Sequence, residues 1–306
     1  MMPRALDPGP ALRPRPAPRA MLVTGVAARV AGGIRKTMTP RILDPRRPLP
    51  PRPVRPAMLA SGLATGLLGL ALGLLGLAAP ARAIVGGGPA SAEVAAQTVM
   101  LVSTRGASCS GAVLAPDLVL TAAHCVAPPA DYAVAVVGEG PPKLIAAARI
   151  ALHPDFDAGQ FRSRRPTPDL ALVKLAAPLP ARFRPVRLGA DAGLPPKGTR
   201  FLIAGFGMAA DGAERSAGTL RTLALPSIGT TGGIMVRLSQ GAGAGACTGD
   251  SGGPALRDGA VAGIVGWVTG PGGTRGCGGV TGITLVGLQR GWITSAARAL
   301  GSAVGD

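Results

Sequence analysis

The stretch CTGDSGGP, residues 247–254, places Ser251 among glycines with an aspartate directly before it. Glycine allows backbone conformations that other residues avoid, and Gly249 and Gly253 carry no Cβ that would obstruct an approaching substrate. A turn of this kind displays a hydroxyl group, and the N–H groups of Gly249 and Ser251 could converge on a developing oxyanion. Taken alone, the stretch fits an ordinary glycine-rich turn equally well.

Two upstream motifs supply the partners that a serine nucleophile needs. His124 lies in TAAHC (residues 121–125), and Asp169 opens the apolar run DLAL (residues 169–172). Because a hydroxyl is a poor nucleophile near neutral pH, a histidine must take its proton, and an aspartate orients that histidine. In isolation His124 would read as an ordinary buried histidine and Asp169 as a turn cap. Together with Ser251 they predict a catalytic triad.

Four motifs in a fixed order carry a family resemblance. IVGG at residues 84–87, TAAHC, DLAL and GDSGGP occur in this sequence, and residues 84–306 resemble the chymotrypsin/trypsin family of serine proteases. The resemblance implies an all-β fold of two six-stranded antiparallel β-barrels, with the active site in the cleft between them and a helix at the C-terminus. It also implies a serine endopeptidase that hydrolyses peptides or proteins through an acyl-enzyme, with no cofactor and no metal.

The apolar pattern after residue 83 favours the same fold class. Short apolar runs broken by glycine and proline are typical of strands in a barrel or sandwich. Only residues 291–300 look helical, because Trp292, Ala296 and Leu300 recur every four residues. The predicted strands lie around residues 99–102, 112–114, 134–137, 170–173 and 201–204.

The four cysteines all follow residue 83, and no C-x-x-C spacing typical of zinc sites occurs. Disulfides formed in an oxidising compartment are the better interpretation, and the residues alone leave three pairings open. The resemblance implies the pairs Cys109–Cys125 and Cys247–Cys277.

The resemblance also assigns a role to Asp250. In relatives, this aspartate is buried and pairs with the free α-amino group of the mature N-terminus, which here is Ile84. A buried carboxylate is costly without such a partner. The pairing would order the oxyanion loop only when the chain begins at Ile84.

The expected substrate pocket contains no charge. The resemblance places Gly245 at its floor and Trp267, Val268 and Gly282 in its walls, so a lysine or arginine side chain would be buried unpaired. Val268 would narrow the entrance, which predicts cleavage after small or medium apolar residues. Alternatively, Gly245 is merely part of the Gly/Ala linker at residues 241–245.

Three features depart from the family pattern. Gly266 stands where a serine is usual, which would remove one hydrogen bond to Asp169. Phe206 replaces a usual tryptophan, and the glycine-rich loop at residues 269–276 is long. The second histidine, His153, is interpreted as structural.

The leader carries most of the formal charge of +17. Residues 1–83 hold 13 Lys/Arg and 2 Asp/Glu (+11), and residues 84–306 hold 19 and 13 (+6), so nucleic-acid binding is not indicated. Residues 1–57 read as an unpacked Pro/Arg-rich leader. Residues 58–83 read as a signal peptide, because the apolar run ends in ARA at residues 81–83.

These features predict a secreted or periplasmic enzyme without stable membrane association after cleavage. Two alternatives remain. A retained membrane anchor over residues 58–79 is long enough to span a bilayer. A catalytically silent, protease-like binding protein is disfavoured because all three triad residues are present.

Overall fold

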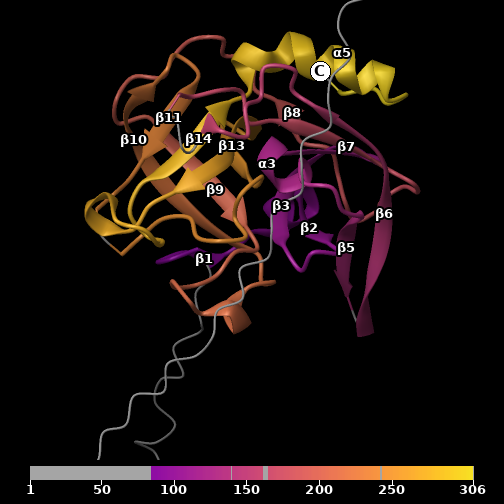
Figure 1. Cartoon of the computed structure of the whole chain (residues 1–306), viewed down its shortest axis with the longest axis horizontal. Helices are drawn as coiled ribbons and strands as arrows, with labels where there is room; N and C mark the ends of the chain where they lie inside the picture. Colours follow the sequence, from indigo (N-terminus) through magenta and orange to yellow (C-terminus); the bar gives the residue numbers. More distant parts are fainter. Residues whose placement is uncertain (1–83, 139, 161–164, 242, 306) are drawn as a thin grey trace, which may run out of the picture. The chain divides into compact units, whose positions relative to one another are not determined.

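The computed structural model describes residues 84–138, 140–160, 165–241 and 243–305. The predicted leader and signal peptide, residues 1–83, lie outside the described residues. The described chain forms two β-barrels, one from its first half and one from its second half (Figure 1). Among the described residues, no helix is long and apolar enough to cross a membrane.

The first barrel is closed and antiparallel, in the strand order β2-β3-β4-β7-β6-β5, and β5 pairs back onto β2. Its interior is aliphatic, with Val99, Val113 and Val134 almost completely buried. The strands are β2 (Thr98–Ser103), β3 (Ser108–Ala115), β4 (Leu118–Thr121), β5 (Tyr132–Gly138), β6 (Gly140–Leu152) and β7 (Ala171–Leu175).

The second barrel has the ring order β10-β11-β14-β13-β12-β9, and the pairing of β9 with β10 closes it. The strands are β9 (Arg200–Gly205), β10 (Arg221–Thr231), β11 (Met235–Leu238), β12 (Pro254–Arg257), β13 (Ala260–Val268) and β14 (Thr281–Leu285). Two short strands extend it: β1 (Gly88–Pro89) pairs with β10, and β8 (Arg187–Leu188) runs parallel to β13. The prediction of two six-stranded antiparallel barrels is confirmed.

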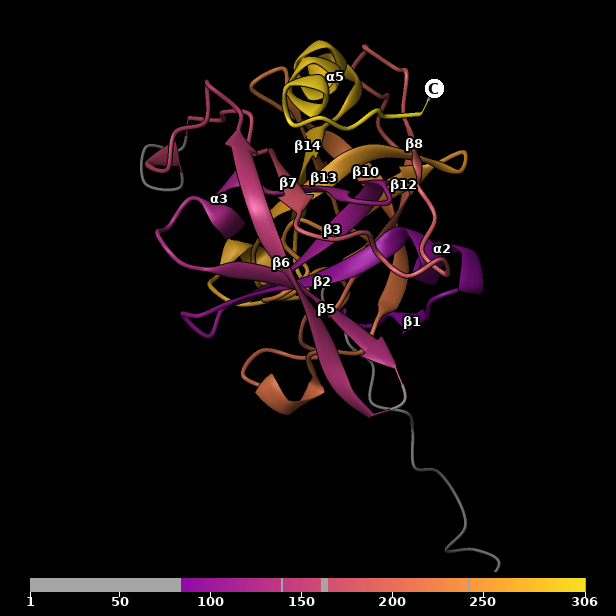
Figure 2. The same ribbon diagram turned by 90° about the vertical axis from the view of Figure 1, so that its right-hand side faces the viewer.

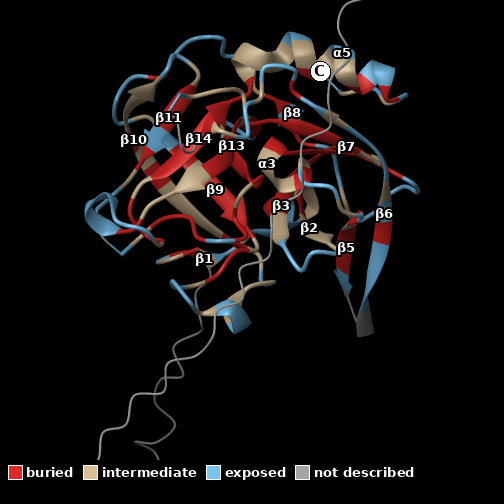
Figure 3. Cartoon of the chain, viewed as in Figure 1, coloured by how far each residue is buried: buried red, intermediate tan, exposed pale blue. Residues whose placement is uncertain are grey.

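A shared apolar layer joins the two barrels. Successive strand residues face opposite sides of a sheet, so Val119 of β4 points into the first barrel while Leu118 and Leu120 pack in the shared layer. Leu256 and Ile264 meet them from the second barrel. Figure 3 shows buried residues on the strands of both barrels.

The predicted C-terminal helix is α5 (Arg290–Ala299), which lies across one end of the barrels (Figures 1 and 2). It buries Ile293 and Ala297 in the shared layer. The guanidinium of Arg149 donates to the carbonyl oxygens of Ala299 and Leu300 at the helix end. At the C-terminal end of a helix, a cation bonds to carbonyl oxygens that have no partner within the helix, and it interacts favourably with the helix dipole.

Two further helices were not expected from the sequence. Helix α2 (Ala92–Gln97) begins at Ser91, whose hydroxyl accepts from the N–H of Val94 at 3.3 Å. Helix α3 (Ala123–Val126) is one turn long. The described residues also form three single-turn 3₁₀ helices: η1 (Glu214–Ser216), η2 (Pro271–Gly273) and η3 (Gly287–Gln289).

Candidate active site

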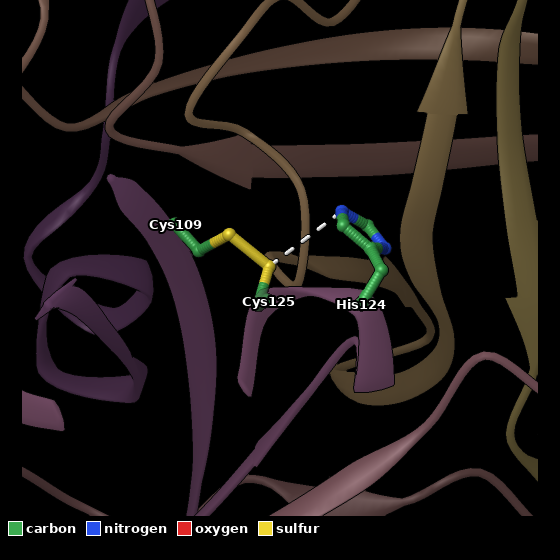
Figure 4. Close-up of side chains that lie close together, drawn as sticks. All are labelled: Cys109, His124 and Cys125. Atoms are coloured by element: carbon green, nitrogen blue, oxygen red, sulfur yellow. Dashed lines mark hydrogen bonds between the residues drawn. A yellow bond between two sulfur atoms is a disulfide. The ribbon is translucent and has the colours of Figure 1, made fainter. Parts of the chain in front are cut away.

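His124 lies on α3, which a disulfide fastens to the first barrel. Cys125 on α3 is bonded to Cys109 on β3, and the imidazole of His124 lies beside this bridge (Figure 4). The Nε2 atom of His124 is 3.7 Å from the sulfur of Cys125. A disulfide sulfur has no proton to donate and is not a thiolate, so this cluster is neither a base partner nor a metal site.

Asp169 holds the imidazole of His124 from the other side. Its side chain is completely buried, whereas that of His124 is 26% exposed. One carboxylate oxygen, Oδ2, lies 2.7 Å from Nδ1 of His124, and the other accepts from the backbone N–H of His124 at 2.9 Å. The ring therefore carries its proton on Nδ1, and the lone pair of Nε2 is the basic site.

The turn that carries Ser251 packs against the strand leading to α3. A Cβ on Gly252 would clash with the hydroxyl oxygen of Thr121 and would lie 3.1 Å from the backbone nitrogen of Ala122. The carbonyl of Ser251 accepts from the N–H of Ser110 at 2.7 Å. These contacts bring the serine of the second barrel to the part of the first barrel that holds His124.

The shape of this turn requires glycine. Gly249 has φ of 97° and Gly252 has φ of 81°, a region that side chains with a Cβ rarely occupy. A Cβ on Gly249 would also lie only 2.8 Å from the Cα of Gly207. The turn can therefore approach the neighbouring chain closely while it presents backbone N–H groups.

Ser110 is a supporting residue that the sequence motifs did not reveal. Its buried hydroxyl donates to the carbonyl of Gly249 and accepts from the N–H of Phe206, both at 2.9 Å. It therefore connects the first barrel to two loops of the second barrel. The contact uses the backbone of Phe206, so this interaction does not depend on a tryptophan at that position.

Asp250 is completely buried beneath the turn. Its carboxylate accepts from the N–H groups of Gly207 at 2.7 Å and Cys247 at 2.8 Å. Burial raises the pKa of the Asp250 carboxyl to about 7, although these two donors and the charge of Arg221 act in the opposite direction. Ile84 is buried in the core of the second barrel, and in the full chain its nitrogen belongs to a peptide bond.

The residues around the expected substrate pocket divide between two faces of one sheet. A Cβ on Gly245 would lie 3.2 Å from the hydroxyl oxygen of Thr281, which is buried and accepts from the N–H of Ala246 at 2.9 Å. Val268 is the cross-strand partner of Thr281, and such partners point to the same side. Gly245, Val268 and Thr281 therefore form one group.

Gly282 belongs to the other face. Its cross-strand partner is Trp267, and a Cβ on Gly282 would clash with the indole ring. Gly282 stays a predicted wall residue, and Thr281, one position earlier, is a further residue beside Gly245 that the motifs did not indicate. The alternation of a strand would have separated the two residues, had the pairing register been known.

Gly266 faces the catalytic aspartate. A Cβ at this position would lie 3.3 Å from Oδ2 of Asp169 and 3.8 Å from the hydroxyl oxygen of Thr284. A serine hydroxyl would therefore reach the carboxylate, as the family pattern implies. The buried Thr284 hydroxyl has no hydrogen-bond partner among the described residues.

A second disulfide, Cys247–Cys277, ties the serine turn to the segment before β14. The two disulfides are the pairs that the family resemblance implies. Each removes conformational freedom from the unfolded chain and fixes one half of the site. The glycine-rich loop nearby is closed by hydrogen bonds of Thr269, which donates to Val280 and accepts from Gly279 at 2.9 and 2.8 Å.

Comparisons with known proteins support the family resemblance. Residues 84–288 match the family model described as Trypsin. Serine protease 1 of Rattus norvegicus is 30% identical over 177 residues, which cover 52% of this chain and 69% of the relative. Trypsin-3 of Salmo salar is 27% identical over 174 residues, which cover 52% of this chain and 71% of the relative.

Among solved structures, the fold is similar to that of neuropsin, a serine protease expressed in the limbic system of mouse brain. The TM-score is 0.57 and the sequence identity 24%, with 69% of this chain and 98% of the neuropsin chain covered. At this identity, the likeness supports the fold alone.

Proposed function

The chain belongs to the trypsin family of serine endopeptidases, and from this premise we propose that it is an exported protease that cleaves after small apolar residues, with His124, Asp169 and Ser251 as its triad. The observation that carries the proposal is the 2.7 Å contact between Nδ1 of His124 and the buried carboxylate of Asp169, on the surface against which the Ser251 turn packs.

Each triad residue has one task in the proposed mechanism. The Oγ of Ser251 attacks the scissile carbonyl while Nε2 of His124 accepts its proton. Asp169 keeps the imidazole in the Nδ1–H tautomer and stabilises the imidazolium. The proton then passes to the leaving amine, which gives an acyl-enzyme, and water repeats the sequence to release the acid.

The backbone of the turn would stabilise the developing negative charge. The N–H groups of Gly249 and Ser251 are the proposed oxyanion donors. Fixed donors of this kind are worth roughly 10²–10³ in kcat, because they need no reorganisation during the reaction. The left-handed glycines and the Ser110 hydroxyl hold this turn in place.

Substrate preference follows from the group Gly245, Val268 and Thr281. It contains no charge, so a lysine or arginine side chain would be desolvated without a partner. The side chains of Val268 and Thr281 occupy space that two glycines would leave open. This supports a preference for alanine, valine and residues of similar size before the scissile bond.

The segment before Ile84 supports a route for export and activation. The apolar run over residues 58–79 and the ARA sequence favour cleavage after Ala83 during secretion. That cleavage would create the Ile84 ammonium and offer a partner to the buried Asp250. The enzyme would then become active on export, without a separate activating protease.

The triad assignment is tested with the exported enzyme and a fluorophosphonate probe. Ser251→Ala should abolish labelling, and Ser251→Ala and His124→Ala should each lower kcat about 10⁴-fold or more while the fold is retained. His153→Ala is the matched control, because the side chain of this second histidine contacts Gln289 and Trp292, and its removal should leave labelling intact. Near-parental hydrolysis by Ser251→Ala would overturn the assignment.

A further inference from the structure

A groove of roughly 580 Å³ opens beside the proposed active site. Two of its lining residues, Arg165 and Pro166, lie a few residues before Asp169 in the chain. Two others, Trp267 and Val268, directly follow the position that faces the carboxylate of Asp169. A peptide held for cleavage at Ser251 therefore has this groove within reach.

The strand register of the second barrel shows where the charged side chain of Arg237 lies in the groove. Arg237 of β11 is opposite Gly282 of β14, which is opposite Trp267 of β13. Directly opposite residues share a face, and Gly282 has no side chain. Arg237 and Trp267 are therefore neighbours on the groove face, and the guanidinium of Arg237 extends toward Gly229, with Nη2 3.2 Å from the position of a Cβ there.

Arg237 has no acidic neighbour among the described residues that line the groove. The described lining contains no aspartate or glutamate, and Arg165 adds a second positive charge to it. The side chain of Arg237 is exposed, and none of the residues that the structure describes forms a salt bridge or hydrogen bond with it. The remaining lining includes the half-buried Trp267 of β13, which provides an apolar surface on the other side of β14 from Arg237.

We propose that this groove binds an aspartate or glutamate side chain of the peptide substrate, so that the enzyme selects an acidic residue at a distance from the scissile bond. The inference rests on the proposed protease function and concerns a different part of the substrate from the small apolar residue. Guanidinium and carboxylate form charge-assisted hydrogen bonds, which are stronger than those between neutral groups.

The position of the acidic residue can be bounded. The guanidinium of Arg237 lies toward β10, two to three strand spacings or about 10–14 Å from β13, and an extended peptide advances about 3.3 Å per residue. The acid should therefore occur about three to five residues from the scissile bond, on one side only.

The first test is a peptide library cleaved by the mature enzyme. We expect glutamate and aspartate to be enriched at one position within that interval. At this position, a peptide pair that differs only in glutamate or glutamine should show a ratio of kcat/KM of about five in favour of glutamate. The ratio should fall toward one as salt screens the contact.

Variants that remove or reverse the charge of Arg237 test whether this residue causes the preference for glutamate. Arg237→Gln should bring the glutamate/glutamine ratio down to about two or less, and Arg237→Glu should favour a lysine peptide over the glutamate peptide. Arg200→Glu is the control, because Arg200 is exposed on β9 of the same barrel and does not line the groove. The glutamate/glutamine ratio of the Arg200→Glu variant should equal that of the parent enzyme.

Two results separate this inference from the proposed function. If Ser251→Ala silences hydrolysis but the library shows no acidic enrichment, or Arg237→Glu leaves the ratio unchanged, the acidic subsite is wrong and the protease function stands. If hydrolysis survives Ser251→Ala, the function itself is wrong.

Discussion

Gly266 leaves Asp169 with one donor fewer than a serine at that position would supply. A Cβ there would lie 3.3 Å from Oδ2 of Asp169 and 3.8 Å from the hydroxyl oxygen of Thr284, so the carboxylate would have to move by a few tenths of an ångström to admit a side chain. The carboxylate therefore depends on the two hydrogen bonds of His124. The buried hydroxyl of Thr284, which lies near the same position, also has no hydrogen-bond partner among the described residues.

Gly266→Ser should therefore improve both catalysis and stability. The new hydroxyl would donate to Asp169 and accept from Thr284, which should raise the free energy of unfolding by about 1 kcal/mol and kcat/KM by about twofold or more. Gly266→Ala adds the Cβ without the hydroxyl and serves as the control in melting and kinetic measurements. An equal gain for both variants would attribute the effect to lost glycine flexibility instead.

Val268 and Thr281 should set the size of the preferred side chain. Val268→Gly should shift the library preference from alanine and valine toward leucine and phenylalanine by about tenfold, because it removes a side chain that faces Gly245. Thr281→Ser keeps the hydroxyl that accepts from Ala246 and removes only a methyl, so it should produce a smaller shift in the same direction. An unchanged profile in both variants would contradict this pocket.

At the scale of elements, the strands and α5 were predictable from pattern, and the register was not. Short apolar runs located β2, β3, β5, β7 and β9, and the four-residue period located α5. The register shift between Val265 and Trp267 places Gly266 as an extra residue in β13. Such a shift changes which β14 residue each side chain meets, and motif spacing could not show that Thr281 faces Gly245.

The short helices were unpredictable for a different reason. Helix α3 has a single turn, and isolated helices of that length are unstable. The Cys109–Cys125 disulfide and the hydrogen bond from the His124 N–H to Asp169 hold it. The motif TAAHC identified the histidine as a base without indicating its helix, since this stabilisation is tertiary.

The docking of α5 should depend on pH through His153. Its Nε2 donates to Gln289 at 3.0 Å, its Nδ1 accepts from the N–H of Asp155 at 3.2 Å, and its ring lies 4.7 Å from that of Trp292. Burial lowers the pKa of His153. The folded state then binds this proton less readily than the unfolded state, so stability falls as pH drops below about 6.5.

His153→Phe tests this expectation. The variant keeps an aromatic ring against Trp292 but cannot titrate, so its melting temperature should change less between pH 7.5 and pH 5 than that of the parent. Both proteins should carry Ser251→Ala, which prevents self-digestion. Identical pH profiles would show that His153 does not control the docking of α5.

At the scale of the whole molecule, each barrel supplies part of a site that neither contains alone. His124 and Asp169 come from the first barrel and the Ser251 turn from the second. The shared apolar layer and Ser110 hold the two barrels in a fixed position relative to each other. The order of the motifs in the sequence indicated this division. Ser110 could not be found in that way, because its role depends on contacts with Gly249 and Phe206 across the two barrels.

The buried carboxyl of Asp250 links this assembly to the N-terminus. With a pKa raised to about 7, it lowers the stability of the uncleaved chain as pH rises from about 4 to about 7, because ionisation is opposed in the folded state and unopposed in the unfolded state. An ammonium on Ile84 would reverse this penalty by pairing with the carboxylate. Ile84 also has φ of 50° in the full chain, which a β-branched residue adopts only under strain and which cleavage would release.

The last prediction compares two proteins that differ by one residue at the N-terminus. One begins at Ile84 and the other at Ala83, whose ammonium would lie one residue too far from the buried carboxylate. We expect only the first to react with a fluorophosphonate at full rate, and its advantage in free energy of unfolding should grow from pH 5 to pH 7 as Asp250 ionises. Measurements in a Ser251→Ala background give the stability without self-digestion. If both proteins have equal activity and their stabilities run parallel with pH, the Ile84 ammonium does not activate this enzyme, and Asp250 must be satisfied by the N–H groups of Gly207 and Cys247 alone.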